Sequence, residues 1–252
     1  MAAAIWLAGC GGGGAPGSAV AAGSPQTVGP PATGTGTMAI VRGDNVFTVA
    51  PDGSNQVQLT NETNSNFANN PAFSPDGTQI AYVYHIAPTG NEWGGAELHL
   101  MKADGSDDKV LVPSKDKGER AENPSWAPDG KSVYFAHDIP IIDDSNKYTG
   151  DKLTVVRVDV ATGQRTVVVP QNGILPAASK SGQLVWVDYD PTTSNFQMMV
   201  GGADGSNPKA ILSQKDFQSV LWPVVSPDGK TIAFSGSGRT NSTVATLGSS
   251  IG

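Results

Sequence analysis

The chain of 252 residues contains a single cysteine, Cys10, so no disulfide can form within it. Its 16 lysines and arginines are outnumbered by 23 aspartates and glutamates, which gives a formal net charge of −7. Proteins that bind nucleic acids neutralise phosphates with basic patches, so this balance argues against a nucleic-acid partner. No stretch approaches the ~20 apolar residues that a transmembrane helix needs. Helical periodicity is also absent, which favours an all-β protein.

Motifs of the common catalytic sites are missing as well. The sequence has no Gly-x-Ser-x-Gly nucleophile elbow, no His-Glu-x-x-His and no P-loop. Of its three histidines, His99 falls inside an expected strand, where a packed, hydrogen-bonded imidazole is the usual outcome. Residues 104–108 carry three aspartates but lack the spaced carboxylates and terminal Glu of an EF-hand loop. We therefore predict no metal site, no cofactor and no catalytic residues.

What the chain does contain is a repeat. Pro71–Val83 recurs as Pro124–Ala136 and as Pro223–Ser235, and a weaker copy begins at Pro176. The four prolines are separated by about 50 residues, a period typical of propellers and solenoids. The repeat therefore bears more directly on the architecture than on the function.

Each copy reads as two strands joined by a tight turn. The turn is Pro-Asp-Gly: proline presets φ, aspartate bonds its own backbone, and glycine takes the positive φ that a side chain would resist. Asp76, Asp129 and Asp228 are therefore expected to be structural turn residues. A second element alternates with the first, for example Leu98–Lys102 followed by Ala-Asp-Gly-Ser and another short apolar run. It supplies two more strands in each repeat.

Four antiparallel strands in about 50 residues correspond to one blade of a β-propeller. We predict an all-β fold, a β-propeller of four-stranded antiparallel blades, occupying residues 38–252 with about four to five blades. Residues 38–60 supply the second, third and fourth strands of a first blade. Three full blades follow at about Pro71–Val112, Pro124–Val169 and Ile174–Leu212.

The end of the chain leaves two alternatives. Leu221–Ser235 supplies the first two strands of another blade, and Thr243–Leu247 is a candidate third. One interpretation is a larger propeller that is cut short at Gly252, leaving an open strand edge. The other is a closed four-bladed ring, in which Leu221–Val225 completes the first blade.

In these motifs the chain resembles the TolB-type propeller repeat, with its aromatic residue, Ser-Pro-Asp-Gly and downstream Asp-Gly-Ser turn. The resemblance covers residues 38–247 or so and implies the fold. The family includes the periplasmic subunit of the Tol-Pal envelope system, lipoproteins of unknown role, and propellers attached to prolyl-oligopeptidase-type peptidases. Unlike the Tol subunit, this sequence shows no α/β domain before the blades.

The N-terminus predicts a lipid anchor. Leu7-Ala8-Gly9-Cys10 resembles the lipobox of bacterial lipoproteins, in which the cysteine becomes the lipidated first residue. Residues 1–9 would be a signal peptide that is short or clipped, since no basic residue precedes the apolar run. Residues 11–37 are uncharged and rich in Gly, Ala, Pro, Ser and Thr, and we interpret them as a flexible tether. An anchored protein of this kind would lie in the bacterial envelope, in the periplasm or at the cell surface.

Function is expected on one face of the propeller. Both families of tight turns must emerge on the same face, so the opposite, loop-rich face receives the longer connections at residues 61–70, 87–96, 114–123, 138–151 and 190–195. Alignment of the second strands on Met38, Ile80, Val133, Leu184 and Ile232 places a polar and aromatic rim at this mouth. The candidate binding residues are Arg42, Tyr84, His85, Trp93, His137, Asp138, Tyr148, Asp188 and Tyr189.

Two classes of function fit this sequence best. The first is a non-enzymatic envelope lipoprotein whose propeller binds or scaffolds a protein, a peptide or a glycan on its loop-rich face. The second is the substrate-gating propeller of a prolyl-oligopeptidase-type peptidase whose hydrolase domain is missing. A lyase or hydrolase that uses the channel mouth is a third possibility.

Overall fold

A computed structural model of the chain describes residues 36–90, 93–115, 118–190, 192–212, 217–226, 228–237 and 247–248, with no side-chain detail for the last pair. These residues form only strands, turns and loops, and they include no helix that could cross a membrane. Cys10, the signal peptide and all but the last two residues of the tether lie outside the described residues.

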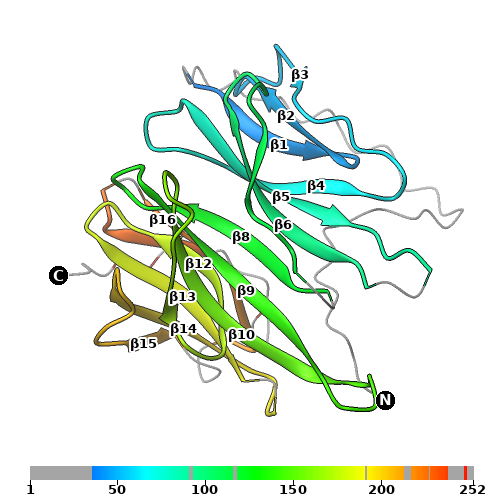
Figure 1. The fold of residues 1–252 in the computed structure, drawn as a ribbon. Helices are drawn as coiled ribbons and strands as arrows, with labels where there is room; N and C mark the ends of the chain where they lie inside the picture. The colour runs from blue at the N-terminus through cyan, green and yellow to red at the C-terminus, as the bar shows by residue number, and fades with distance from the viewer. Residues whose placement is uncertain are drawn as a thin grey trace, which may run out of the picture.

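The strands form five successive blades (Figure 1). Blade 1 comprises β1 (Met38–Arg42), β2 (Asn45–Val49) and β3 (Val57–Gln58). Blade 2 comprises β4 (Phe67–Phe73), β5 (Gln79–Ile86), β6 (Gly95–Lys102) and β7 (Lys109–Val112). Blade 3 comprises β8 (Arg120–Trp126), β9 (Ser132–Ile142), β10 (Tyr148–Asp159) and β11 (Arg165–Val169). Blade 4 comprises β12 (Gly173–Ala178), β13 (Gln183–Asp190), β14 (Asn195–Gly202) and β15 (Lys209–Leu212). Blade 5 comprises β16 (Ser219–Val225), β17 (Thr231–Ser237) and β18 (Leu247–Gly248).

The all-β propeller prediction and the division into blades are confirmed. Within each blade consecutive strands pair antiparallel, and a single parallel bridge between Ala96 and Arg120 joins blades 2 and 3. β16 pairs with β17 and not with β1 in the described residues, so the proposed completion of the first blade by Leu221–Val225 is not observed. Of the expected third strand, Leu247 pairs with Ile232, while residues 243–246 lie outside the described residues.

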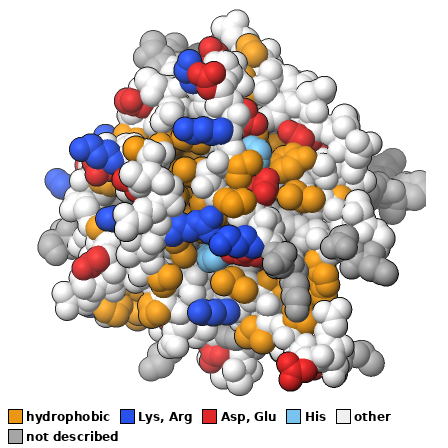
Figure 2. Space-filling model, viewed as in Figure 1, with side chains coloured by type: hydrophobic (Ala, Val, Ile, Leu, Met, Phe, Trp, Pro, Cys, Tyr) orange, Lys and Arg blue, Asp and Glu red, His pale blue; other side chains and the backbone are white. Residues whose placement is uncertain are grey.

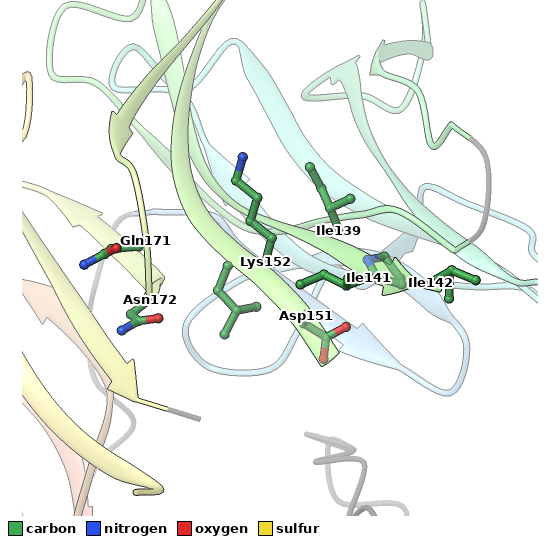
Figure 3. Close-up of a pocket in the computed structure, with 9 residues that line it drawn as sticks. Ile139, Ile141, Ile142, Asp151, Lys152, Gln171 and Asn172 are labelled. Atoms are coloured by element: carbon green, nitrogen blue, oxygen red, sulfur yellow. The ribbon is translucent and has the colours of Figure 1, made fainter. Parts of the chain in front are cut away.

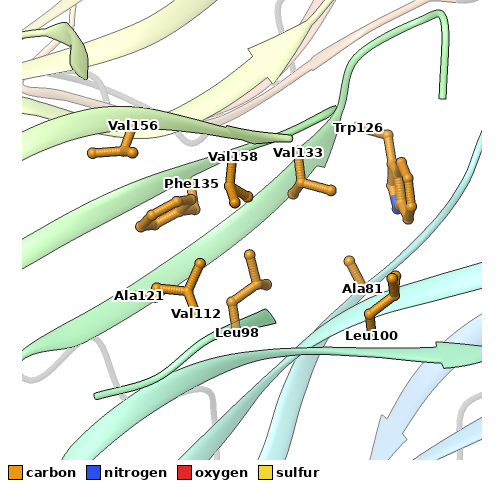
Figure 4. Packing of buried hydrophobic residues seen from close by; sticks show 10 residues of the cluster. All are labelled: Ala81, Leu98, Leu100, Val112, Ala121, Trp126, Val133, Phe135, Val156 and Val158. Atoms are coloured by element: carbon orange, nitrogen blue, oxygen red, sulfur yellow. The ribbon is translucent and has the colours of Figure 1, made fainter. Parts of the chain in front are cut away.

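Hydrophobic cores lie between neighbouring blades. Leu98 and Leu100 of blade 2 pack against Val133 and Phe135 of blade 3, and all four are buried (Figure 4). Similar clusters lie between blades 1 and 2, between blades 3 and 4, and between blades 4 and 5. A strand covered on both faces has no reason to alternate apolar and polar residues. That explains the continuous apolar runs in the second strands of blades 2, 3 and 4, namely β5, β9 and β13.

In blades 2 to 5 the first strand begins before the proline that marks the repeat. The predicted starts at Pro71 and Pro124 are wrong by four residues, because the proline lies inside the strand at a β-bulge. The residue before each proline has a positive φ, and this set comprises Asn70, Asn123, Leu175 and Trp222. A leucine or tryptophan in this conformation is strained, so the bulge is imposed by the blade and not by the local sequence.

The tight turns lie together on one face, as predicted. The backbone N–H of Ala103, in the turn after β6, donates to the carbonyl of Thr78, in the turn between β4 and β5, at 2.9 Å. Val160 makes the equivalent bond to Lys131 in blade 3. In the first turn Asp76 accepts hydrogen bonds from the Ser74 hydroxyl and the Thr78 N–H. These bonds hold the pKa of Asp76 below its usual value. Asp129 and Asp228 likewise accept a backbone N–H within their own turns, so the turn aspartates have the expected structural role.

One predicted loop on the opposite face is wrong. Residues 138–151 were expected to be irregular, but β9 continues to Ile142 and β10 begins at Tyr148, so only Asp143–Lys147 form a turn. The β-branched and aromatic residues among them allow the ladder to extend. The resulting β9–β10 hairpin is longer than its counterparts and extends towards the lower right of Figure 1.

Candidate binding site on the loop-rich face

The aligned rim residues lie at one level of the propeller but on alternating sides of their blades. Successive side chains of a strand point to opposite faces, and Tyr82 belongs to the core between blades 1 and 2. Tyr84 therefore faces blade 1, whereas His85 faces blade 3, and the same alternation applies to His137 and Asp138. The structure thus divides the predicted rim into separate clusters at successive blade interfaces.

His85 lies between blades 2 and 3. Its ring stacks on Phe67 with centroids 4.1 Å apart, and its Nε2 lies 3.2 Å from Asn69 Oδ1 and 3.7 Å from Glu122 Oε2. Burial and the nearby Arg120 lower the pKa of His85 to about 4, and burial raises the pKa of Glu122 to about 7. At neutral pH the imidazole is therefore uncharged, and its contact with Glu122 is a polar contact without an ion pair.

Asp138 belongs to a cluster on blade 3. Arg120 donates from Nη2 and Nε to Asp138 Oδ2, at 2.5 and 3.1 Å. Burial and the neighbouring carboxyl of Asp151 together raise the pKa of Asp138 to about 6, although the Arg120 guanidinium lowers it. Tyr148 donates its hydroxyl to Asp151 Oδ2 at 2.5 Å, and burial together with this bond raises the pKa of Tyr148 to about 12.

Two acceptor atoms in this cluster lack a donor. The Oδ1 atoms of Asp138 and Asp151 are buried and receive no hydrogen bond from any donor group among the described residues. Two carboxylates have no donor between them, so the nearby carboxyl of Asp151 favours the protonated form of Asp138. Arg120 is the cation of the cluster, and the carboxyls of Asp138, Glu122 and Asp151 all act on its pKa.

His137 faces the opposite side of blade 3 and contacts Glu119. Its Nε2 lies 2.5 Å from Glu119 Oε1, while Glu119 Oε2 accepts a bond from the backbone N–H of Lys115 at 3.1 Å. Ser114 donates its hydroxyl to the Glu119 carbonyl. This network joins Ser114, Lys115 and Glu119, which lie between β7 and β8, so His137 serves at least to position these residues.

Tyr84 lies between blades 1 and 2, together with His99, which is not one of the predicted rim residues. Tyr84 accepts a hydrogen bond from Asn66 Nδ2 at 2.7 Å. His99 lies between Asp108, 3.3 Å from Nδ1, and Glu97, 3.4 Å from Nε2. Burial alone would lower the pKa of His99, but these carboxylates outweigh it and raise the pKa. The imidazole is packed and hydrogen-bonded inside its strand, as the sequence predicted.

The remaining candidates are dispersed. Arg42, at the end of β1, donates to Gln56 Oε1 at 2.8 Å. Trp93 is 44% exposed and packs against the backbone of Gly118, where an added Cβ would lie 3.4 Å from the Trp93 Cβ. Asp188 is half-buried, and burial together with Asp190 raises its pKa. Tyr189 packs against Phe196 with centroids 4.8 Å apart.

A pocket of about 530 Å³ opens beside the β9–β10 hairpin (Figure 3). The hairpin contributes both strands to its wall, and the segment between β11 and β12 contributes Gln171 and Asn172. The residues from the hairpin are Ile139, Pro140, Ile141, Ile142, Asp151, Lys152 and Leu153. Ile141 is 49% exposed. Figure 2 shows acidic and basic side chains interspersed on one face of the molecule, with hydrophobic groups between them.

No set of His, Cys, Asp or Glu side chains in the described residues has the arrangement of a metal site. The site residues that the sequence analysis missed are Glu119, Arg120, Glu122 and Asp151. A signal for two of them was present: Arg120-Ala-Glu122-Asn-Pro aligns with Phe67-Ala-Asn-Asn-Pro of the previous repeat. The shared alanine, Ala121 or Ala68, faces the core, so its flanking residues had to face away from it.

Comparisons with solved structures support the architecture. The chain is similar to a structure assigned as TolB from Agrobacterium tumefaciens, with a TM-score of 0.59, 18% identity, and coverage of 81% of this chain and 67% of that one. It is similar to TolB from Acinetobacter baumannii, with a TM-score of 0.59, 17% identity, and coverage of 78% and 44%. A puromycin-hydrolyzing peptidase from Mycobacterium tuberculosis matches with a TM-score of 0.51, 16% identity, and coverage of 83% and 38%.

These likenesses show a TolB-type propeller fold. The chain spans about two thirds of the Agrobacterium structure and less than half of the other two. No protein-family model and no curated protein matches the sequence.

Proposed function

We propose that this chain is a non-enzymatic lipoprotein of the bacterial envelope whose propeller holds a partner on its loop-rich face. Of the partner classes that the sequence left open, a protein or peptide is favoured over a glycan. The pocket beside the hairpin is bordered by strands and apolar side chains, which suit an extended polypeptide.

The observation that carries this proposal is the difference between the two faces. On the tight-turn face, aspartates such as Asp76 and Asp104 accept hydrogen bonds within their own turns. On the loop-rich face, Asp138 and Asp151 leave buried oxygens without donors, next to a pocket and an exposed isoleucine. Unpaired acceptors cost free energy, and such a cost is commonly retained where a partner supplies the missing donors.

A photo-crosslinking experiment tests the location. A benzoylphenylalanine replaces Trp93 on the loop-rich face, and in a matched variant it replaces the exposed Lys180 on the tight-turn face. We expect crosslinks to one discrete envelope protein from position 93 and none from position 180. The same products from both positions, or products from position 180 alone, would refute a site on the loop-rich face.

The lipid anchor is a separate part of the proposal. Leu7–Cys10 supports it, and the TolB-like fold is compatible with a periplasmic location. Metabolic labelling with an alkyne fatty acid should mark the wild-type protein and leave Cys10→Ser unlabelled. Equal labelling of both proteins would exclude acylation at Cys10. Expression behind a complete signal peptide ensures that the assay reports on the cysteine.

The alternative is the propeller domain of a peptidase, which the likeness to the mycobacterial peptidase favours. In that case a hydrolase domain would be encoded in the same reading frame. The complete reading frame discriminates directly between the two proposals. A catalytic domain on either side would replace the scaffold proposal, and its absence would support it.

A further inference from the structure

The outer edge of β10 is partly unpaired. β10 runs from Tyr148 to Asp159, but β11 pairs only with the part from Val155 to Val158. From Tyr148 to Thr154, β9 is the only described strand that pairs with β10. β11 stops at Val169 because the next residue is Pro170, which has no N–H to continue the ladder. Backbone groups of alternate β10 residues therefore lack a strand partner along this edge.

The pocket lies along this unpaired edge. It is lined by Asp151, Lys152 and Leu153 of β10, by the end of β9, and by Gln171 and Asn172 just beyond the end of β11 (Figure 3). A strand placed next to β10 here would lie in line with β11 and would continue the sheet past Pro170. Seven residues of extended chain span about 23 Å, so residues 148–154 offer a ladder long enough to bind a short segment.

The chemistry of the edge indicates the kind of segment. Asp151 lines the pocket, and its Oδ1 is buried without a donor, as is Oδ1 of Asp138. Arg120 donates a hydrogen bond to Asp138 Oδ2, and Tyr148 donates one to Asp151 Oδ2. A guanidinium or ammonium group from outside would supply the donors that these two oxygens lack, and the isoleucines beside it would cover an aliphatic stem.

We propose that the edge of β10 from Tyr148 to Thr154 accepts an extended segment of the partner as an added strand, with a basic side chain of that segment paired to Asp151. This inference rests on the proposed function, because it specifies how the loop-rich face binds a protein. Main-chain hydrogen bonds to β10 provide the affinity, and the carboxyl pair provides the selectivity for a basic residue.

Binding is linked to a proton. The contact between Asp138 and Asp151 requires a proton, and a cation placed between them substitutes for it. The groups that face this pair are Arg120 and Glu122 from β8 and Tyr148 from β10. A bound arginine therefore releases a proton near pH 6, and its affinity increases from pH 5 to pH 8.

Three capped, fluorescein-labelled peptides test the proposal with the whole chain. The first is Thr-Val-Thr-Arg-Thr-Val-Thr, the second has citrulline in place of arginine, and the third is the arginine peptide N-methylated at alternate residues. Citrulline keeps the shape of arginine without its charge, and N-methylation removes backbone donors. We expect the arginine peptide to bind at least about tenfold more tightly than the citrulline peptide, since a hydrogen bond to a charged group is worth that much. A similar loss is expected for the N-methylated peptide, because several backbone hydrogen bonds are removed together.

Two variants locate the contact. Asp151→Asn keeps the shape of the pocket and should abolish the preference for arginine over citrulline. Asp144→Asn removes an exposed carboxylate from the turn of the same hairpin and should leave the preference intact. Amide chemical shifts should change along residues 148–154 when the arginine peptide binds.

Equal binding of the arginine and citrulline peptides, a preference that survives Asp151→Asn, or no binding of any peptide at 1 mM would each overturn the proposal. Crosslinking from position 93 is unaffected by these outcomes. If it still captures one partner, the proposed function stands and only the strand-addition mode is wrong. If both experiments fail, the assignment of the loop-rich face fails with them.

Discussion

Replacing Asp151 with asparagine should stabilise the free protein above pH 6, although it removes a carboxylate from an ion-pair cluster. The wild-type pair places two buried carboxyls in contact, and their Oδ1 atoms have no donor. An asparagine amide would donate to Asp138 Oδ1 at any pH and still accept the Tyr148 hydroxyl. The Arg120–Asp138 ion pair is retained in this variant.

The magnitude follows from the pKa of Asp138, which burial and Asp151 raise from 3.8 to about 6. When the pKa of a carboxyl group is higher in the folded state, the protein loses stability as pH rises from the unfolded-state pKa to the folded-state pKa of that group. The whole shift corresponds to about 3 kcal/mol at about 1.4 kcal/mol per unit. Burial is the largest cause of the raised pKa and is still present in the variant. Removal of the carboxyl contact with Asp151 should therefore increase the free energy of unfolding by about 1 to 2 kcal/mol.

Urea denaturation of wild type and Asp151→Asn between pH 4 and pH 8 measures the effect. The difference in unfolding free energy should be close to zero at pH 4 and should grow to its full value above pH 6. In thermal unfolding the gain corresponds to about 2 to 4 °C per kcal/mol for a domain of this size. Other titrating groups are common to both proteins and cancel in the difference. A variant that is less stable at pH 8, or a difference that does not depend on pH, would refute the paired-carboxyl interpretation.

Three further perturbations test the fold. Gly77→Val places a β-branched residue at a φ of 72° with open space around it, so backbone strain alone should cost about 1 to 3 kcal/mol in urea denaturation, and an unchanged midpoint would contradict the turn assignment. Trp126→Phe removes the indole N–H that donates to the Ala72 carbonyl across blades 2 and 3 at 2.9 Å, and should cost about 1 to 3 kcal/mol; a smaller loss would mean that water replaces the donor. His99→Gln should destabilise the protein at pH 5 and have less effect at pH 9, because a raised pKa contributes stability that is lost as pH rises through the folded-state value. Equal destabilisation at both pH values would indicate packing alone.

The sequence by itself determined the all-β propeller class and the turns. A turn is specified by adjacent residues, so Ser-Pro-Asp-Gly read in sequence gives the same local structure wherever it occurs. The repeat of about 50 residues then orders the strands, and the continuous apolar runs show that both faces of the second strands are covered. The shared face of the tight turns also follows, because antiparallel strands reverse direction at every connection.

The tertiary structure alone decided which polar residues meet. His85 and Glu122 are far apart in sequence and belong to different blades, so their contact depends on how the two sheets pack. The predicted rim treated strand ends as equivalent, whereas alternation sends neighbouring side chains to different interfaces. The length of the β9–β10 hairpin was also missed, because residues 138–151 contain polar and turn-forming types that can continue a ladder only when a partner strand is present. The pairing of Asp138 with Asp151, and the unpaired edge of β10 beside it, exist only because that ladder extends past the end of β11.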